Sequence, residues 1–204
     1  MNTILNNKNT FLDHKCKDVN FNTILGFWIY IMSDCILFAS LFATYMVLIN
    51  TKINEPIFKE IFNLRNIFIE TIILLLSAFS YGIAMSKINF KNIKCINNWL
   101  FVTFLLGGFF LILEFNELYN FIKINFGPNY NSYMSGFFSI IVTHGIHVFI
   151  GLVWILTIII NLNKYGLNSI NKTRLICLSL FWHFLDIIWI CVFTIIYLLG
   201  YMYK

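Results

Sequence analysis

The stretch Trp182–Trp189, read W-H-F-L-D-I-I-W, places two ionisable side chains inside an apolar run. That run, Leu175–Gly200, is long enough to cross a bilayer, which takes about 20 apolar residues in a helix. A charged group at bilayer depth costs roughly 2.5–3.5 kcal/mol on insertion scales. We therefore expect His183 and Asp186 to face protein and to have polar partners. Because they are three residues apart, their side chains lie on nearly one face of the predicted helix.

The composition predicts an all-α, polytopic membrane protein. Of the 204 residues, 59% are hydrophobic and 11% are charged, whereas a soluble domain carries about 25% charged residues. The apolar runs do not alternate at period two, as the strands of a membrane barrel would. The basic residues stand singly between these runs and form no stripe, so nucleic acid is not an expected partner.

Five apolar runs of spanning length predict five transmembrane helices in a bundle. They lie at about residues 26–49, 65–85, 97–118, 135–161 and 175–200. Residues 1–25 are polar and predict a mobile cytoplasmic tail, so that residues 26–204 make up the transmembrane domain. The tail lacks the basic, apolar and small-residue segments of a signal peptide, and we expect the first span to drive insertion.

The distribution of lysine and arginine predicts the orientation. Nine basic residues fall on one side of the predicted membrane: Lys8, Lys15, Lys17, Lys87, Lys91, Lys94, Lys164, Lys172 and Arg174. Five fall on the other side: Lys52, Lys59, Arg65, Lys123 and Lys204. Since cytoplasmic connections carry the excess of positive charge, we expect the N-terminus in the cytoplasm and the C-terminus in the periplasm.

Counting about 1.5 Å per residue along each span sorts the buried polar groups into two layers. The layer near mid-membrane contains Asp34, His144, His147, His183 and Asp186. The layer nearer the outer face contains Glu70, Glu114 and Glu117. We expect the fourth and fifth spans to touch, with His144 or His147 hydrogen-bonded to Asp186 or His183. The sequence assigns no role to Glu70.

These polar groups admit several chemical interpretations. The H-x-x-H, H-x-x-D and E-x-x-E spacings offer ligand types for a metal, and histidines on separate helices could clamp a haem. Ionisable groups at depth could also relay protons. The simplest interpretation is an interhelical hydrogen-bond network that fixes how the helices pack. Each such bond contributes about 1 kcal/mol.

Three segments carry a family resemblance. Gly26–Tyr45 reads G-F-W-I-Y-I-M-S-D-C-I-L-F-A-S-L-F-A-T-Y, Thr143–Trp154 reads T-H-G-I-H-V-F-I-G-L-V-W, and Phe181–Phe193 reads F-W-H-F-L-D-I-I-W-I-C-V-F. These segments resemble subunit III of haem–copper terminal oxidases. The first segment and the five-span length are most similar to the quinol-oxidase branch, the bacterial cytochrome bo-type ubiquinol oxidases. The resemblance covers nearly the whole chain after the tail.

The resemblance implies a subunit of a respiratory oxidase in the bacterial inner membrane that is not an enzyme by itself. It implies no catalytic residue, metal or cofactor in this chain, because the haems and copper belong to subunit I. The implied partners are chiefly subunit I, with subunits II and IV and phospholipids, and the implied role is assembly and stability of the complex. Five residues match family-typical positions without being ligands: Glu114, His144, His147, His183 and Asp186.

Two functions of other classes stay open at this point. The mid-membrane histidines and aspartates could belong to a self-contained membrane redox enzyme. The buried carboxylates could instead form the proton path of a small transporter. Against transport, the sequence has no inverted repeat and no interrupted span of the kind that forms transporter binding sites.

Overall fold

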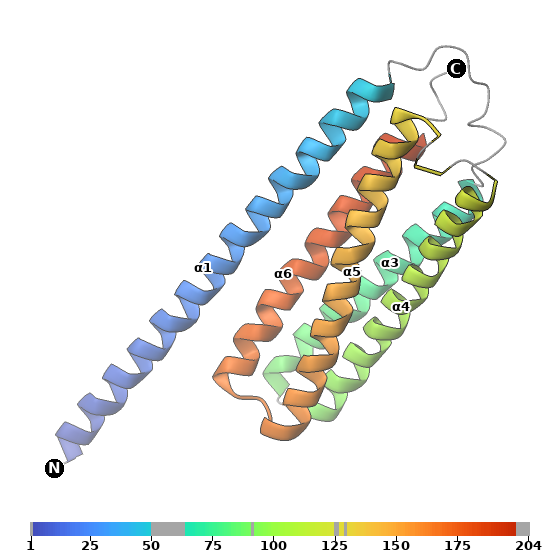
Figure 1. Cartoon of the computed structure of the whole chain (residues 1–204). Helices are drawn as coiled ribbons and strands as arrows, with labels where there is room; N and C mark the ends of the chain where they lie inside the picture. The colour runs from blue at the N-terminus through green and yellow to red at the C-terminus, as the bar shows by residue number, and fades with distance from the viewer. Residues whose placement is uncertain (1, 50–63, 91, 125–126, 129, 199–204) are drawn as a thin grey trace.

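The computed structural model describes residues 2–49, 64–90, 92–124, 127–128 and 130–198. The described part of the chain is helical and contains no strand. Its long helices are α1 (Asn2–Ile49), α3 (Leu64–Ser86), α4 (Ile93–Lys123), α5 (Ser132–Tyr165) and α6 (Ser169–Val192) (Figure 1). A short 3₁₀ turn, η1 (Lys87–Phe90), follows α3, and a π-helical segment, η2 (Phe193–Leu198), continues α6.

Five segments of these helices are long and apolar enough to cross a membrane, which confirms the predicted fold class. They are Phe21–Leu48, Arg65–Ser86, Ile93–Lys123, Ser132–Tyr165 and Ser169–Leu198. Each contains the core of one predicted span, and the bounds differ by a few residues because polar turns of helix extend beyond the apolar stretch. The predicted connection 50–63 and residues 199–200 of the fifth span lie outside the described residues.

The N-terminal segment differs from the expected mobile tail. Helix α1 begins at Asn2 and runs without a break into the first span. Residues 2–25 contain no glycine or proline, the two residues that most strongly interrupt a helix, so nothing in them ends the helix that the span begins. At about 1.5 Å per residue, α1 is about 70 Å long, more than twice the hydrocarbon thickness of a bilayer. The cytoplasmic placement of this segment stays a prediction.

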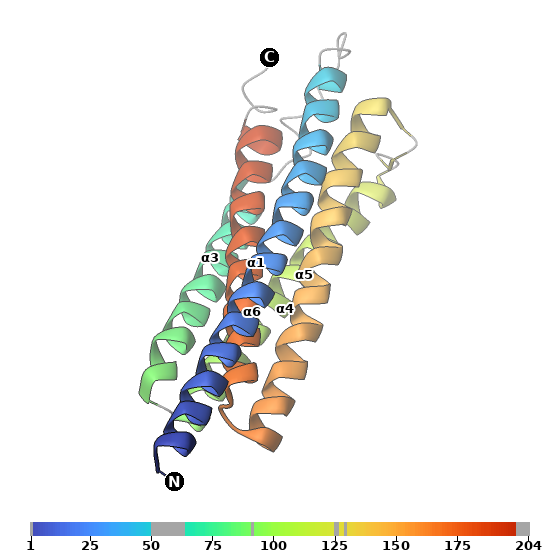
Figure 2. The same cartoon turned by 90° about the vertical axis from the view of Figure 1, so that its left-hand side faces the viewer.

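Helix α6 occupies the middle of the bundle. It packs against α1, α3 and α5, while α4 packs against α3 and α5. Helix α1 lies at one edge, where it contacts α5 and α6 (Figures 1 and 2). The beginning of α1 and the end of α6 lie at opposite ends of the bundle, as an odd number of crossings requires.

A tight connection sets α5 and α6 side by side. Gly166 follows α5 with φ 67°, a conformation that L side chains rarely adopt. Its N–H donates to the carbonyl of Leu162 at 3.0 Å, which closes the last turn of α5. The side-chain amide of Asn171 in turn donates to the carbonyl of Gly166 at 2.8 Å, which ties α6 to the same turn. This geometry places the middle of α6 opposite the middle of α5.

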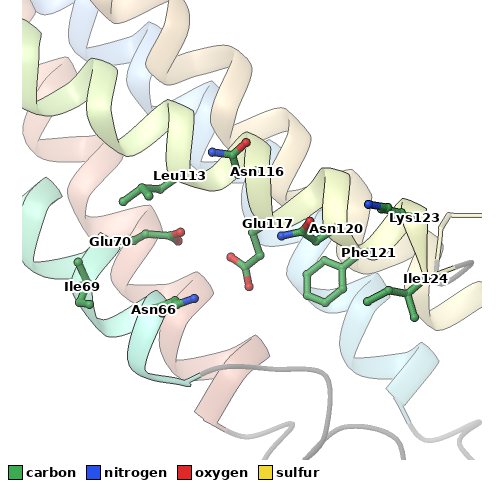
Figure 3. Close-up of a pocket in the computed structure, with 10 residues that line it drawn as sticks. All are labelled: Asn66, Ile69, Glu70, Leu113, Asn116, Glu117, Asn120, Phe121, Lys123 and Ile124. Carbon is green, nitrogen blue, oxygen red and sulfur yellow. The ribbon is translucent and has the colours of Figure 1, made fainter.

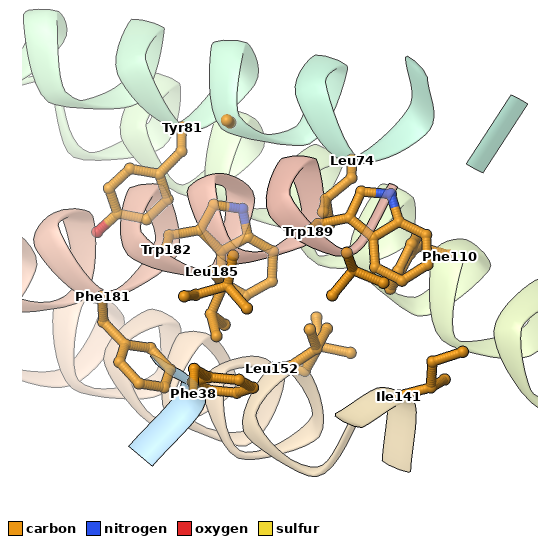
Figure 4. Packing of buried hydrophobic residues seen from close by; sticks show 14 of the residues in the cluster. Phe38, Leu74, Tyr81, Phe110, Ile141, Leu152, Phe181, Trp182, Leu185 and Trp189 are labelled. Carbon is orange, nitrogen blue, oxygen red and sulfur yellow. The ribbon is translucent and has the colours of Figure 1, made fainter. Parts of the chain in front are cut away.

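The core is built around the two tryptophans that frame W-H-F-L-D-I-I-W (Figure 4). The indole of Trp182 is fully buried, and its N–H donates to the hydroxyl of Ser77 on α3 at 3.1 Å. Its six-membered ring fits between Gly107 of α4 and Gly151 of α5, where an added Cβ would lie 3.0 Å from the ring. Small residues on two helices therefore create the space for one large residue on a third.

Hydroxyl groups join α3 to the helices on either side of it. Trp189 donates its indole N–H to Thr71 at 3.2 Å, two helical turns from the contact of Trp182. Tyr81 donates to the backbone carbonyl of Leu175 on α6 at 2.9 Å. Ser80 is hydrogen-bonded to Thr103 on α4 at 2.7 Å. In hydrocarbon, where water cannot compete, such bonds contribute about 1 kcal/mol each to helix association.

The fit around Trp182 predicts a position-specific effect of adding one methyl group to α4. Gly107→Ala should destabilise the protein by about 1–3 kcal/mol, because Trp182 is also confined on its Gly151 side and cannot move away. Thermal unfolding of the purified protein measures this. Gly108→Ala is the matched control, since an added Cβ there meets nothing within 4 Å. Equal melting temperatures for the two variants would contradict the packing described for Trp182.

Candidate functional site: buried carboxylates and histidines

His144, on α5, is fully buried, with 0% of its surface exposed. Its Nδ1 lies 3.7 Å from Oε1 of Glu114 on α4, and its Nε2 lies 3.4 Å from the carbonyl of Leu185 on α6. The ring is tilted against Trp189 at a centroid distance of 5.1 Å and meets Phe110 edge-on at 5.9 Å. One imidazole therefore connects α4, α5 and α6.

His147, one turn further along α5, makes the corresponding contact with α1. Its Nδ1 lies 2.7 Å from the carbonyl of Thr143, and its Nε2 lies 3.8 Å from Oδ2 of Asp34. The ring of Phe38 packs against the imidazole at 5.3 Å. Both histidine–carboxylate contacts lie within the distance of an ion pair.

Asp186 and His183 do not join these contacts, contrary to the expectation from their spacing. Asp186 is buried, and its Oδ1 has no hydrogen-bond partner among the described residues. His183 is exposed on the surface of α6. The expected hydrogen bond from His144 or His147 to either residue is not formed. The fourth and fifth spans do touch, as expected, but through the Leu185 carbonyl and the aromatic rings.

Glu70 and Glu117 lie together at the outer ends of α3 and α4. Their carboxylates point into the same space between the two helices (Figure 3). This space is a cavity of about 730 Å³ that is also lined by Asn66, Asn120 and Lys123. Glu70 is 3% exposed and its Oε2 has no hydrogen-bond partner within the described segments. These two glutamates therefore line one polar cavity, while their position towards the outer face of the membrane stays a prediction.

Glu114 was predicted to lie in the same layer as Glu70 and Glu117, but its carboxylate contacts His144 instead. Depth along the sequence put Glu114 about two turns above His144, whereas their side chains are in ion-pair contact. The count along each helix omits helix tilt and the length of a glutamate side chain. Gly145 makes the approach possible, since a Cβ at that position would lie 3.2 Å from the Glu114 carboxylate.

The geometry of these residues does not fit a haem or metal site. Each α5 histidine has one ring nitrogen at a backbone carbonyl and the other at a carboxylate. The rings of Trp189 and Phe110 cover His144 and leave no space for a porphyrin. In the described ranges, no three His, Cys, Asp or Glu side chains come together as a metal-binding group. That the chain binds no cofactor stays a prediction.

Sequence reasoning missed a second set of polar contacts, made by hydroxyl and amide groups. Tyr45 of α1 is hydrogen-bonded to Tyr133 of α5 at 2.5 Å, and Asn97 of α4 to Asn163 of α5. Tyr45 and Tyr133 both lie near one end of their spans, and this shared position is the feature of the sequence that could have predicted their contact. Uncharged polar residues are common in such sequences, and nothing in the spacing singles out the pairs that meet.

The burial of His144 predicts a large effect of its removal. His144→Leu leaves Glu114 buried without its partner, and breaking a buried ion pair in this way costs about 3–5 kcal/mol. Retention of the subunit during detergent washing, together with its thermal unfolding, measures the loss. His183→Leu is the control on the exposed side of α6 and should leave the thermal unfolding of the isolated chain unchanged. If the two variants behave alike, the burial described for His144 is incorrect.

Comparison with known proteins identifies relatives over nearly the whole chain. The family described as cytochrome c oxidase subunit III matches residues 4–201. The chain is 49% identical to the cytochrome bo(3) ubiquinol oxidase subunit 3 of Pseudomonas putida, over 87% of this chain and 86% of that one. It is 47% identical to the protein of the same name from Buchnera aphidicola subsp. Acyrthosiphon pisum, over 98% and 96%.

A more distant relative preserves the same length. The quinol oxidase subunit 3 of Bacillus subtilis is 37% identical, over 95% of each chain. The family match over residues 4–201 covers all five spans described above. The chain belongs to the cytochrome c oxidase subunit III family.

Proposed function

We propose that this chain is the non-catalytic subunit III of a proton-pumping ubiquinol oxidase of the aerobic respiratory chain. The observation that carries the proposal is the near-complete alignment with relatives named ubiquinol oxidase subunit 3, at 47–49% identity. With five spans and bacterial relatives, the chain is a multi-pass protein of the bacterial inner membrane. It is a subunit of an oxidoreductase complex and not the catalytic subunit.

The finer assignments follow from the same proposal. Subunit I oxidises ubiquinol, reduces oxygen and holds the haems and copper. The present chain contacts chiefly subunit I, with subunits II and IV and phospholipids completing its surroundings. The contacts of His144 and His147 support this assignment, because both ring nitrogens of each histidine already face a carbonyl or a carboxylate.

The buried polar residues have a structural role in this proposal. Asp34, His147, Glu114 and His144 link α5 to α1 and α4. Buried Asp186 lies between the two core tryptophans in sequence. Glu117 faces the polar cavity, and exposed His183 faces lipid or a neighbouring subunit. The network holds five helices in one arrangement and so presents a fixed surface to the rest of the complex.

An affinity tag on this chain tests the proposal. Purification in mild detergent should recover a complex that carries the haem spectrum, the copper and the ubiquinol oxidase activity. The same chain expressed without the other subunits should show no Soret band and less than stoichiometric metal. A Soret band or about one metal per isolated, folded chain would identify a self-contained redox protein. Recovery of the chain without any haem-bearing subunit would equally refute the proposal.

A further inference from the structure

A polar cavity of about 730 Å³ lies between α3 and α4, apart from the histidine contacts described above. Glu70 and Asn66 line it from α3, and Glu117 and Asn120 line it from α4 (Figure 3). On each helix the two side chains are three or four residues apart, which places them on one face. The two helices therefore present carboxylate and amide groups to one shared space.

The carboxylate of Glu70 is buried in this cavity without a partner. Only 3% of the residue is exposed, and its Oε2 has no hydrogen-bond partner among the described residues. The side chain points into the cavity in Figure 3. Because burial removes the water that would stabilise an ionised carboxylate, such a group is normally paired with a positive charge or coordinated to a metal. No described side chain supplies that charge at Glu70.

A second carboxylate adds to the negative charge of the cavity. Glu117 shares the space with Glu70, whereas the neighbouring Glu114 is already in contact with His144. Lys123 also lines the cavity, but no ion pair joins it to either glutamate within the described segments. Two carboxylates thus face one space in which no described basic side chain neutralises them.

The cavity lies near the ends of both helices, where an ion can enter from water. Glu70 is six residues from the first residue of α3, and Glu117 is six residues from the last residue of α4. Each is therefore about 9 Å from a helix end. Helix α4, with 31 residues, is about 46 Å long and exceeds the hydrocarbon thickness of about 30 Å. The side chains of Asn66 and Asn120 are exposed at the mouth of this space.

We propose that Glu70 and Glu117 bind one calcium ion, with the amide oxygens of Asn66 and Asn120 as further ligands. Two carboxylates balance the charge of a divalent cation, and a ligand set made only of oxygen suits a hard cation. Two bidentate carboxylates and two amides supply about six oxygen atoms, within the six to eight that calcium takes in its adaptable geometry. Magnesium requires a near-ideal octahedron and keeps several waters, so this ligand set favours calcium.

The site departs from the expectation, implied by the family resemblance, that this chain holds no metal. Its ligands do not include three His, Cys, Asp or Glu side chains, in line with the absence of such groups from the described ranges. Calcium has no redox chemistry at this site and exchanges with chelators, so it takes no part in oxidising ubiquinol. The inference rests on the proposed structural role of the chain, and it identifies a cation as a link between α3 and α4.

The calcium dependence of the stability of the intact oxidase tests the proposal. The complex is isolated with its haems in an uncharged detergent, washed with EGTA and heated with increasing calcium at constant ionic strength. The temperature at which half of this subunit has dissociated should rise by about 3–6 °C and then saturate. Half of the rise should occur at about 0.1–1 mM calcium, the range of weak oxygen-ligand sites.

The double variant Glu70→Gln/Glu117→Gln removes both charges and keeps the shapes of the side chains. It should lose the calcium-dependent rise, and equilibrium dialysis with radioactive calcium should show about one ion fewer per complex than in the wild type. Asp186→Asn is the matched control, because it removes a buried carboxylate that does not line the cavity. Its response to calcium, measured from its own EGTA baseline, should equal that of the wild type.

Three results would overturn the proposal. The first is a wild-type complex with the same stability in EGTA and in 10 mM calcium, as expected if protons or a basic side chain of a neighbouring subunit neutralise the glutamates. The second is an equal calcium response in the double variant. The third is an equal rise with magnesium.

The wild-type titration decides the question even where the double variant does not assemble. Because each measurement starts from a complex already isolated with its haems, a negative result leaves the assignment to an oxidase intact. Analysis of the EGTA-washed chain for haem, iron and copper tests that assignment separately.

Discussion

An ionisable side chain buried in hydrocarbon must find a partner within the protein, and this constraint organises the bundle around His144. From α5, its ring contacts α4 through Glu114 and α6 through Leu185 and Trp189. Because no water is available at this depth to replace a lost contact, these helices cannot shift without exposing an unsatisfied group. His147 applies the same constraint to α1 through Asp34. The contacts between carboxylates and imidazoles thus fix the positions of neighbouring helices relative to one another.

Close packing of the α6 tryptophans adds to these polar contacts between helices. Trp182 and Trp189 are seven residues apart and therefore point in nearly the same direction, two turns from each other. Both indoles donate to hydroxyls of α3, and the glycines of α4 and α5 accept the bulk of Trp182. Helix α6 is held by hydrogen bonds at α3 and by close packing at α4 and α5. These contacts fix α6 between α3, α4 and α5, which suits the proposed role of supporting a catalytic neighbour.

The five spans could be predicted from the sequence because mean hydropathy is averaged over about 20 residues, so an error of a few residues at either end of a span changes it little. The sequence did not predict the rotation of each helix. His183 and Asp186 are three residues apart, which separates their directions by about 60°. The edge of the buried stripe falls between them, so one is exposed and the other is not. The pairing of Glu114 with His144 was also missed, since it depends on tilt and on the space left by Gly145. Of the histidines and carboxylates singled out from the sequence, Asp34, Glu114, His144 and Asp186 are buried, His147 and Glu117 are half-buried, and His183 is exposed.

The central claim is that His144 and His147 contact the carboxylates of Glu114 and Asp34 and hold nothing else. A cryo-EM map of the complete oxidase, at a resolution that shows side chains and bound lipids, tests it most directly. The account predicts continuous protein density from Glu114 to His144 and from Asp34 to His147, with no other density between α4, α5 and α6. An ion or a porphyrin coordinated by either histidine would contradict it.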